Sequence, residues 1–523
     1  MRRRPNRSGT LPETRGGGTS DSVGLYGIPG MENEFVSTWQ IEIWAGLHYV
    51  ALAGLCLYGI HRLWLLACWF MECKRPPHAP RRLPSPRNLP RVTIQLPLYN
   101  ERFVAARLVD AVARMDWPKD RLEIQVLDDS TDDTRAIVDE RVIHWRNKGI
   151  RIRVIRRRDR KGYKAGALEH GLRQARGEFI AIFDADFLPP QGFLKRTIPF
   201  FSGEKIGMVQ ARWDFLNAEY SWLSSIQSLL LRPHFSIEHG VRFRRGLFFN
   251  FNGTAGIWRR KAIETAGGWQ SDTVTEDLDL SYRAQLRGWR FVYLDDLAVP
   301  SELPVTMASF RIQQQRWAKG SIQTAKKILP QLLVSPVRWS VKMEATAHLL
   351  ANLGWLLGTV VFLTLYPAIL WRVGIGTYQI LRIDLPLILC TSLAMLLYFF
   401  IHALRSRPAI PFYHLLLLPI LGIGIAPCLA LSVLRGFFSR GGIFERTPKF
   451  GIRGRDRLPR FAFLYQQQRV FHLILNAVLF TYGLLPILFA WQRETWPAVP
   501  FLALFPLGFF SVLILDLKEM VKQ

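Results

Sequence analysis

The chain has 523 residues, of which 49% are hydrophobic, and a formal net charge of +27. The length exceeds one ordinary domain and the apolar share is high for a soluble chain, so the composition favours a membrane protein with a sizeable polar part. Much of the basic excess borders apolar segments, where anionic lipid is a simpler partner than nucleic acid, and we expect no nucleic-acid partner. The five cysteines form no C-x-x-C pair and support neither a zinc site nor a disulfide framework.

The first 90 residues are predicted to form a tail, a span and a linker. Residues 1–35 are polar, Gly-rich and without periodicity, so we expect a disordered tail. Residues 36–72 contain an almost charge-free run and are predicted to form the first transmembrane helix. Residues 73–90 are dense in Lys and Arg, which favours the cytoplasmic side for this linker and for the domain that follows it.

Residues 91–300 alternate short apolar bursts with helical spacing. Strand-like bursts occur in "RVTIQLPLYNE", "LEIQVLDDS", "RIRVIRR" and "EFIAIFDADF", and helical spacing occurs in "RFVAARLVDAVARM" and "KAGALEHGLRQAR". Strands that alternate with helices predict a mostly parallel, doubly wound α/β sheet. Such sheets bind ligands at the carboxyl ends of their strands, where the acidic turns "YNE", "LDDS" and "DADF" fall.

The most informative of these turns carries Asp184 and Asp186, which are two residues apart on an extended chain and share one face. Such a pair can hold Mg²⁺ or Mn²⁺ on a substrate phosphate. A lone D-x-D is more often a solvated acidic turn, but the preceding "FIAIF" argues for a buried strand that delivers the pair to a site. No P-loop occurs, so a metal and basic residues such as those of "RKGYKAG" must neutralise any diphosphate.

The C-terminal part holds further apolar runs. We expect interfacial helices with a QxxRW sequence over residues 301–344, two transmembrane helices over 345–411 and two more over 468–523. Residues 412–467 are predicted to form an interfacial or re-entrant helix and a loop, because a full crossing would place the Arg-rich segment that follows outside. Pro419 and Pro427 support that interpretation. The count is then five spanning helices.

Four signatures occur in the order "VLDDSTDDT", "FDADF", "TED" and "QQQRW", flanked by apolar segments. Together they resemble the membrane-embedded family-2 processive glycosyltransferases of the cellulose synthase and mannan synthase type. The resemblance covers roughly residues 91–320 and the layout of the C-terminal part, and "QLPLYNE" and "FNGTAGIWR" are similar to glucomannan synthase-like proteins. It implies a GT-A (Rossmann-like) cytoplasmic domain inserted between transmembrane helices.

The same resemblance implies roles for individual residues. Asp186 would ligate the metal on the diphosphate, and Asp277 would be the general base that deprotonates the acceptor hydroxyl. The residues implied in donor nucleotide-sugar binding are Tyr99, Glu101, Asp128, Asp129, Lys164 and Asp184. Those implied at the acceptor and the diphosphate are Gln313, Arg316, Trp317 and Glu276. A gating-like loop that closes over the donor would use Phe444, Thr447 and Lys449.

"TED" also begins a predicted helix. Thr275 can cap it, and Glu276, Asp277 and Asp279 then occupy its first turn, at the positive end of the helix dipole. For Glu276 and Asp279 that dipole role is the better explanation. For Asp277 the other three signatures favour catalysis.

The resemblance implies a processive, inverting hexosyltransferase that polymerises a β-linked glucan or mannan, 1,4-linked by expectation, and translocates it. Its cofactor would be Mg²⁺ or Mn²⁺, and its partners a UDP- or GDP-hexose, the growing glycan and membrane lipids. Two alternatives stay open: a single-addition glycolipid synthase similar to ceramide glucosyltransferases, and a basic scaffold with a degenerate transferase domain. The sequence leaves the nucleotide, the hexose, the linkage and any accessory subunit or oligomer undetermined.

Overall fold

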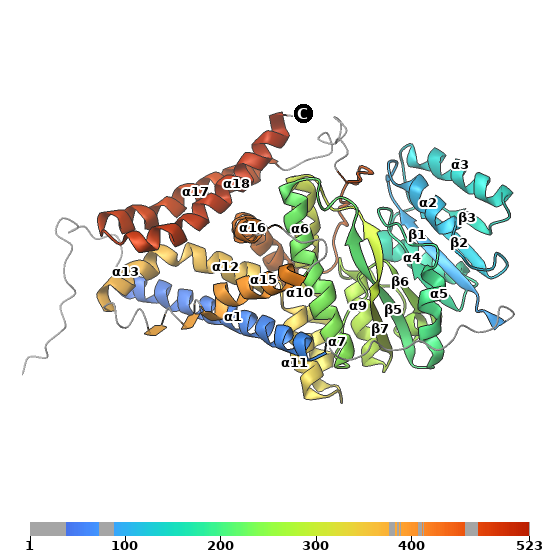
Figure 1. The fold of residues 1–523 in the computed structure, drawn as a ribbon, viewed down its shortest axis with the longest axis horizontal. Helices are drawn as coiled ribbons and strands as arrows, with labels where there is room; N and C mark the ends of the chain where they lie inside the picture. Colours follow the sequence, from blue (N-terminus) through green and yellow to red (C-terminus); the bar gives the residue numbers. More distant parts are fainter. Residues whose placement is uncertain are drawn as a thin grey trace, which may run out of the picture.

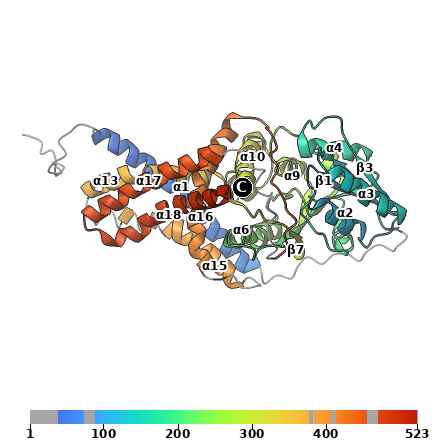
Figure 2. The same ribbon diagram turned by 90° about the horizontal axis from the view of Figure 1, so that it is seen from above.

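The computed structural model describes residues 38–72, 88–375, 389–405, 413–454 and 469–521, with 382–383, 386–387 and 411 as isolated positions. The predicted disordered tail and most of the basic linker lie outside the described residues. An α/β domain occupies one end of the molecule and long helices the other, with α6 (Trp222–Pro233), α10 (Met307–Val334) and α11 (Trp339–Leu349) between them (Figures 1 and 2).

The α/β domain is built on one seven-stranded sheet with the strand order β3-β2-β1-β4-β6-β5-β7. Parallel pairing joins β3, β2, β1 and β4, and also β5 with β7, whereas β6 runs antiparallel to β4 and β5. The strands are β1 (Val92–Leu98), β2 (Leu122–Asp128), β3 (Ile152–Ile155), β4 (Phe179–Ile182), β5 (Ile206–Phe215), β6 (Gly256–Arg259) and β7 (Arg290–Ser301). The predicted α/β sheet of GT-A type is confirmed, with β6 as the antiparallel exception.

Apolar side chains on both faces explain why the central strands form. Every residue of β4 is buried, and so are all but one of β1, because helices cover both faces of the sheet. The helices of this domain are α2 (Ala105–Ala113), α3 (Thr134–Asn147), α4 (Tyr163–Gln174), α5 (Phe193–Thr197), α7 (Gly240–Arg244), α8 (Arg260–Thr265) and α9 (Glu276–Leu286). Because β1, β2 and β4 are parallel neighbours, their acidic turns meet at one edge of the sheet.

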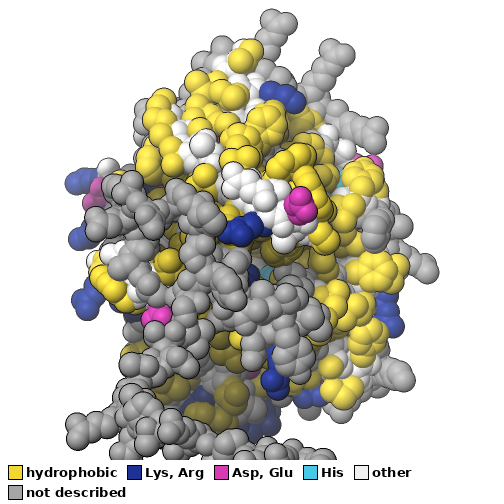
Figure 3. Space-filling view, turned by 90° about the vertical axis from the view of Figure 1, so that its left-hand side faces the viewer, with side chains coloured by type: hydrophobic (Ala, Val, Ile, Leu, Met, Phe, Trp, Pro, Cys, Tyr) yellow, Lys and Arg dark blue, Asp and Glu magenta, His cyan; other side chains and the backbone are white. Residues whose placement is uncertain are grey.

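The described residues contain four helices that are long and apolar enough to cross a membrane: Trp39–Glu72, Tyr413–Phe438, Val470–Gln492 and Trp496–Val521. A fifth candidate is the pair Trp339–Leu349 and Leu353–Leu363, which is bent by 57°. The remaining apolar helices are α13 (Leu365–Ile375) and the short Leu389–Arg405, which includes α15 (Ala394–Arg405). Hydrophobic side chains cover much of the described surface when the molecule is seen from this helical end (Figure 3). The number of crossings and the orientation stay predictions.

One of these helices covers the segment for which the sequence predicted an interfacial or re-entrant position, and that placement stays a prediction. We expected an interfacial or re-entrant segment after residue 412, but α16 (Tyr413–Phe438) is a continuous helix of 26 residues that meets the length and hydropathy requirements of a span. Both of its prolines lie inside the helix. Proline removes one hydrogen bond and bends a helix, and neighbouring helices make this tolerable in apolar surroundings. α16 packs against both α10 and α18 (Val499–Val521).

Buried ion pairs join the helical part to the α/β domain. Arg311 of α10 pairs with Asp516 of α18, and Arg242 pairs with Glu344 of α11 at 2.8 Å. Arg62 of α1 (Thr38–Glu72) contacts Glu238 in the segment between α6 and α7. Breaking one partner of such a pair leaves an uncompensated buried charge. The pairs of Arg62 and Arg242 therefore fix how the domain sits on α1 and α11. Within the helical part, α17 (Arg469–Gln492) packs on α18.

Candidate active site

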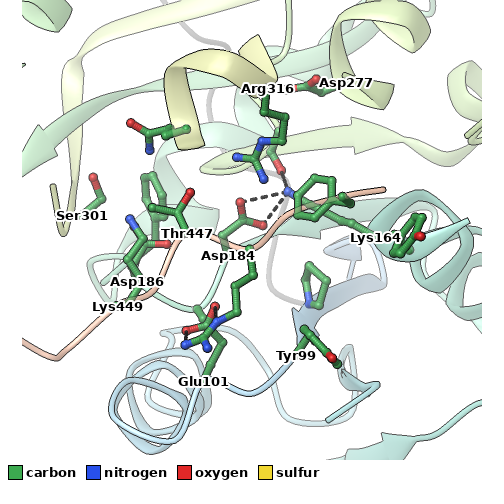
Figure 4. Close-up of a pocket in the computed structure, with 18 of the residues that line it drawn as sticks. Tyr99, Glu101, Lys164, Asp184, Asp186, Asp277, Ser301, Arg316, Thr447 and Lys449 are labelled. Atoms are coloured by element: carbon green, nitrogen blue, oxygen red, sulfur yellow. Dashed lines mark hydrogen bonds and ion pairs between the residues drawn. The ribbon is translucent and has the colours of Figure 1, made fainter. Parts of the chain in front are cut away.

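A cavity opens where the carboxyl ends of β1 and β4 meet α9, α10 and the segment that follows α16 (Figure 4). Fourteen of the fifteen predicted site residues line this cavity although they are scattered along the sequence, and Asp128 is the exception. The predicted residues that line it are Tyr99, Glu101, Asp129, Lys164, Asp184, Asp186, Glu276, Asp277, Gln313, Arg316, Trp317, Phe444, Thr447 and Lys449. The geometry thus brings nearly the whole predicted set together.

Lys164, in the first turn of α4, lies at the centre of this cavity. Its ammonium is 2.6 Å from Asp184 Oδ1, donates to the carbonyl of Gly253 at 2.9 Å and lies 4.0 Å from Glu276. Burial opposes the charged form of Lys164, but Asp184 and Glu276 outweigh it and raise its pKa. One cation therefore joins the D-x-D turn to the start of α9.

The start of α9 carries the predicted base. Burial raises the pKa of Asp277, although the Lys164 ammonium acts in the opposite direction. Burial also raises the pKa of the neighbouring Glu276, to about 7. The three acidic residues occupy the first turn as predicted, but Thr275 makes no capping hydrogen bond, because its hydroxyl lies 3.2 Å from that of Thr324 instead. The Asp277 carboxylate accepts from its own helix at Leu278 N, 2.9 Å.

The other two acidic residues of that turn differ in surroundings. Asp279 is fully buried and paired with Arg283 at 2.7 Å and Lys327 at 2.9 Å, which fits the structural role predicted for it. Glu276 instead lines the cavity. Its position agrees with the acceptor and diphosphate placement rather than with a dipole role alone.

Gly253 makes the close approach of two segments feasible. Its φ is +79°, and a Cβ atom at this position would lie 2.8 Å from Asp277 Oδ2 and 3.4 Å from Lys164 Nζ. Only glycine adopts this conformation freely and leaves that space open. The "FNGT" turn thereby lets the backbone carbonyl reach Lys164 directly beside the predicted base.

The side of the cavity where the sequence predicts the nucleotide is rich in arginine. Asp129 is held by Arg157, whose Nε donates to it at 3.1 Å and whose Nη2 makes a second, shorter contact. The Arg160 guanidinium stacks over the Tyr99 ring with its carbon 3.2 Å from the ring centre. Asp129 is thus partnered, and the flat Tyr99 and Arg160 pair forms the adjoining wall.

Asp128 does not line the cavity. As the last residue of β2 it is 2% exposed and accepts from Arg156 at 2.9 Å and from the backbone N–H of Ser130 at 3.0 Å. Consecutive residues of a strand point to opposite faces, so Asp128 and Asp129 cannot serve the same space. The structure gives Asp128 a structural role in the turn, and a contact with a nucleotide stays a prediction.

The QxxRW residues enter from α10. Arg316 lies with its guanidinium carbon 4.2 Å from the centre of the Phe444 ring and is labelled above the D-x-D turn in Figure 4. Burial lowers the pKa of Arg316, although the cavity carboxylates favour its charge. The Gln313 side-chain oxygen is buried and has no hydrogen-bond partner among the described residues. α10 therefore presents a cation and an amide to the same space as Asp184.

The segment after α16 closes the other side. Arg446 forms a two-pronged ion pair with Glu101, at 3.1 and 3.0 Å. Lys449 donates to Asp186 at 2.8 Å. Burial raises the pKa of Glu101 to about 7, and Arg446 opposes that shift. The predicted gating-like loop thus lies over the site and occupies two of its carboxylates.

Sequence reasoning missed several residues that shape the cavity: Arg157, Arg160, Gly253, Glu302 and Arg446. Signals for two of them were present, because Arg160 is the first residue of "RKGYKAG" and Gly253 lies in the quoted "FNGT". The partners of Arg446 and Glu302 are far away in sequence, and no local sequence pattern predicts such contacts.

The residues at the D-x-D turn fit a hard divalent cation in part. Asp184 and Asp186 supply carboxylate oxygens, which Mg²⁺ and Mn²⁺ prefer, but the described residues contain no group of three or more acidic, His or Cys side chains that could hold a metal alone. Mg²⁺ is commonly bound by one or two carboxylates together with substrate phosphates. A cation at this turn would therefore be held jointly by these carboxylates and by the oxygens of a diphosphate.

Residues 90–320 match the model of a family described as glycosyltransferase like family 2. This segment is a family 2 glycosyltransferase domain. The domain has close relatives in plants: the chain is 47% identical over 251 residues to glucomannan 4-beta-mannosyltransferase 2 of Arabidopsis thaliana, covering 47% of each chain. Glucomannan 4-beta-mannosyltransferase 1 of Oryza sativa subsp. japonica is 47% identical over 249 residues, covering 47% of this chain and 48% of that one. The chain spans about half the length of the curated relatives it matches.

A solved structure shares the fold. The mannosyltransferase PcManGT from Pyrobaculum calidifontis, in complex with GDP-Man and Mn²⁺, aligns with a TM-score of 0.50 and 21% identity, over 76% of this chain and 98% of that one. At this identity the likeness establishes the fold of the glycosyltransferase domain and nothing about its ligands.

Proposed function

We propose that the chain is a processive, inverting glycosyltransferase that extends a β-1,4-linked mannan or glucomannan from a nucleotide sugar and passes the product through its membrane helices. The observation that carries the proposal is Lys164, whose ammonium lies between the donor-side carboxylate of Asp184 and the acidic turn that bears Asp277. Donor and acceptor chemistry then share one cavity. The mannosyl and 4-β assignments rest on the names of the plant relatives.

The cavity residues have separate roles in the proposed reaction. An acceptor hydroxyl attacks C1 of the donor sugar, the bond from C1 to the diphosphate oxygen breaks, and the nucleoside diphosphate leaves with that electron pair. Asp277 takes the hydroxyl proton, and its raised pKa makes it a better proton acceptor than an exposed aspartate. Arg316 offsets charge on the departing diphosphate, and Trp317 supplies a face for the acceptor sugar. Attack from the side opposite the leaving group converts an α-linked donor into a β-linkage.

Asp186 and Asp184 would hold Mg²⁺ or Mn²⁺ together with the donor diphosphate. When bound, such an ion stabilises charge on the leaving group. In the structure Lys164 and Lys449 balance the same two carboxylates, at 2.6 and 2.8 Å. These two lysines therefore keep the turn neutralised before the donor arrives.

The membrane part of the proposal follows from packing. α10, which carries the acceptor residues, packs directly on α16, and α16 packs on α18. Trp317 therefore lies on a helix that contacts a candidate spanning helix, and the growing glycan would pass from one to the other. We propose a multi-pass protein with the glycosyltransferase domain on the cytoplasmic side, as the basic linker predicts.

The test uses the full chain purified into lipid nanodiscs with Mg²⁺ or Mn²⁺. GDP-mannose, UDP-glucose and other nucleotide sugars are offered singly, and nucleotide release and product size are recorded. High-molecular-weight product that β-mannanase digests is expected from a mannose donor. Asp277→Asn is expected to lose this activity, whereas the matched control Asp296→Asn, an exposed aspartate on β7, retains it.

The alternative is a single-sugar glycolipid product. The loop with Phe444, Thr447 and Lys449 closed over the cavity favours the polymerase, because repeated addition needs the donor side to close and reopen around a retained acceptor. A lipid-linked monosaccharide as the sole product would replace the polymerase with the glycolipid synthase. Equal activity of Asp277→Asn and the wild-type protein would remove Asp277 from the mechanism.

A further inference from the structure

Glu302 is a buried acid that none of the four sequence signatures includes. It follows β7 directly and precedes α10, so it lies between the sheet and the helix that carries Arg316. Only 2% of its surface is exposed, and it lines the cavity. Burying a carboxylate is costly unless it is paired and hydrogen-bonded, so the partners of Glu302 indicate what it holds in place.

Those partners come almost entirely from the segment after α16. Its two carboxylate oxygens accept from the backbone N–H groups of Phe450, at 2.8 Å, and Gly451, at 3.0 Å. Its backbone carbonyl accepts from the Lys449 ammonium at 2.7 Å. Arg107 of α2 completes the set at 3.1 Å. Side chain and main chain of one residue thus bind three consecutive positions of the loop.

These bonds determine where the preceding loop residues lie. Lys449 reaches Asp186 from the anchored position, and Thr447, two residues earlier, turns toward the cavity (Figure 4). The Thr447 hydroxyl is buried and has no hydrogen-bond partner among the described residues. A buried hydroxyl without a partner is unusual, and a phosphate oxygen in the cavity would satisfy it.

The carboxylate contacts of Glu302 do not depend on the loop side chains, because they are made with backbone N–H groups. Gly451 makes this approach feasible, since its φ is +79° and a Cβ atom would lie 3.1 Å from the carbonyl oxygen of Phe103. The contrast is Arg446, which holds Glu101 through its side chain alone. The loop is therefore held at its backbone by the Glu302 carboxylate, and through side chains by Arg446 and Lys449.

We propose that Glu302 is a positioning residue that fixes Thr447 and Lys449 against the diphosphate of the donor, and that its contacts with Phe450 and Gly451 are the point from which the loop closes. The ligand in this inference rests on the proposed function. Glu302 touches neither the nucleobase wall at Tyr99 nor the acceptor residues, so it acts on phosphate binding alone.

The test compares two ligands that differ only in phosphate. Affinities of the nucleoside diphosphate and of the unphosphorylated nucleoside are measured by displacement of a fluorescent nucleotide, with GDP and UDP both tried on the full chain in nanodiscs. Glu302→Gln is expected to weaken diphosphate binding by about tenfold or more and to change nucleoside affinity by no more than about twofold. The amide loses the charge, keeps only one acceptor oxygen and turns an NH2 group toward the other backbone N–H. Glu264→Gln, an exposed paired glutamate, is the matched control with both affinities unchanged.

A second variant approaches the same contact from the loop and keeps the buried charge. Gly451→Ala strains the backbone at the anchor and is expected to show the same selective loss for the diphosphate. Equal losses for nucleoside and diphosphate in these variants overturn the inference, since they indicate general damage, and so do unchanged affinities. If the wild-type protein binds neither GDP nor UDP, the proposed function fails and the inference with it.

Discussion

Lys164→Met tests whether the electrostatics of the cavity set the state of the predicted base. The Lys164 ammonium lies 4.0 Å from Glu276, and it opposes the burial that raises the pKa of both Glu276 and Asp277. At an effective dielectric constant of about 20, unit charges at that separation interact by about 4 kcal/mol. Since one pKa unit corresponds to about 1.4 kcal/mol, removing the cation raises these pKa values by up to about 3 units.

The sign of the expected change follows from the role of Asp277. A base works when deprotonated, so a higher pKa moves the acidic limb of the kcat/KM profile to higher pH. For Lys164→Met we expect the limb to move up by about 1 to 3 pH units, with activity recovering partly as pH rises. Lys164→Arg keeps the charge and is expected to keep the limb.

The assay is nucleotide release from the donor with acceptor present, measured across about pH 5 to 9, where perturbed carboxylates titrate. Binding of the donor is measured separately, because Lys164 also contacts Asp184 and its loss raises KM. A Lys164→Met protein that loses activity while its acidic limb stays at the wild-type pH would refute the electrostatic argument. A shifted acidic limb in Lys164→Arg would also refute it, because that variant keeps the charge.

Three further outcomes are expected. Gly253→Ala places a Cβ atom 2.8 Å from Asp277 Oδ2, so kcat should fall by about tenfold or more with little change in donor KM. Asp516→Asn leaves Arg311 buried without its charge partner and should cost about 3 to 5 kcal/mol in thermal unfolding, whereas Arg311→Met combined with Asp516→Leu should recover much of it. Chelation by EDTA should stop nucleotide release, and added Mn²⁺ should restore it.

Periodicity predicted the parallel half of the sheet because those strands are short apolar bursts separated by amphipathic helices. The acidic turns after β1, β2 and β4 then had to meet, since carboxyl ends of parallel strands lie at one edge. The order and direction of β5, β6 and β7 could not be predicted from the local sequence. β6 is only four residues long, and the partners of β5 are β6 and β7, which are set by contacts across the sheet rather than by local pattern.

Adjacent acids illustrate where a motif alone misleads. "LDDS" suggested two donor residues, yet the alternation of a strand sends Asp128 to Arg156 and leaves Asp129 for the cavity. That alternation was available from the sequence. The capping role of Thr275 could not be judged in the same way, because its competing partner Thr324 lies on another helix.

The contacts of the loop after α16 depend on the complete fold. Arg446 and Glu101 are 345 residues apart, and Lys449 and Asp186 are 263 apart. Each carboxylate at this side of the cavity is thus matched by a cation delivered from a distant segment. A nucleotide diphosphate with its metal brings both signs of charge, so it can replace Lys449 at Asp186 without leaving either group unbalanced. That exchange requires the ammonium to move while the backbone stays in place, which is what an anchor at Glu302 permits.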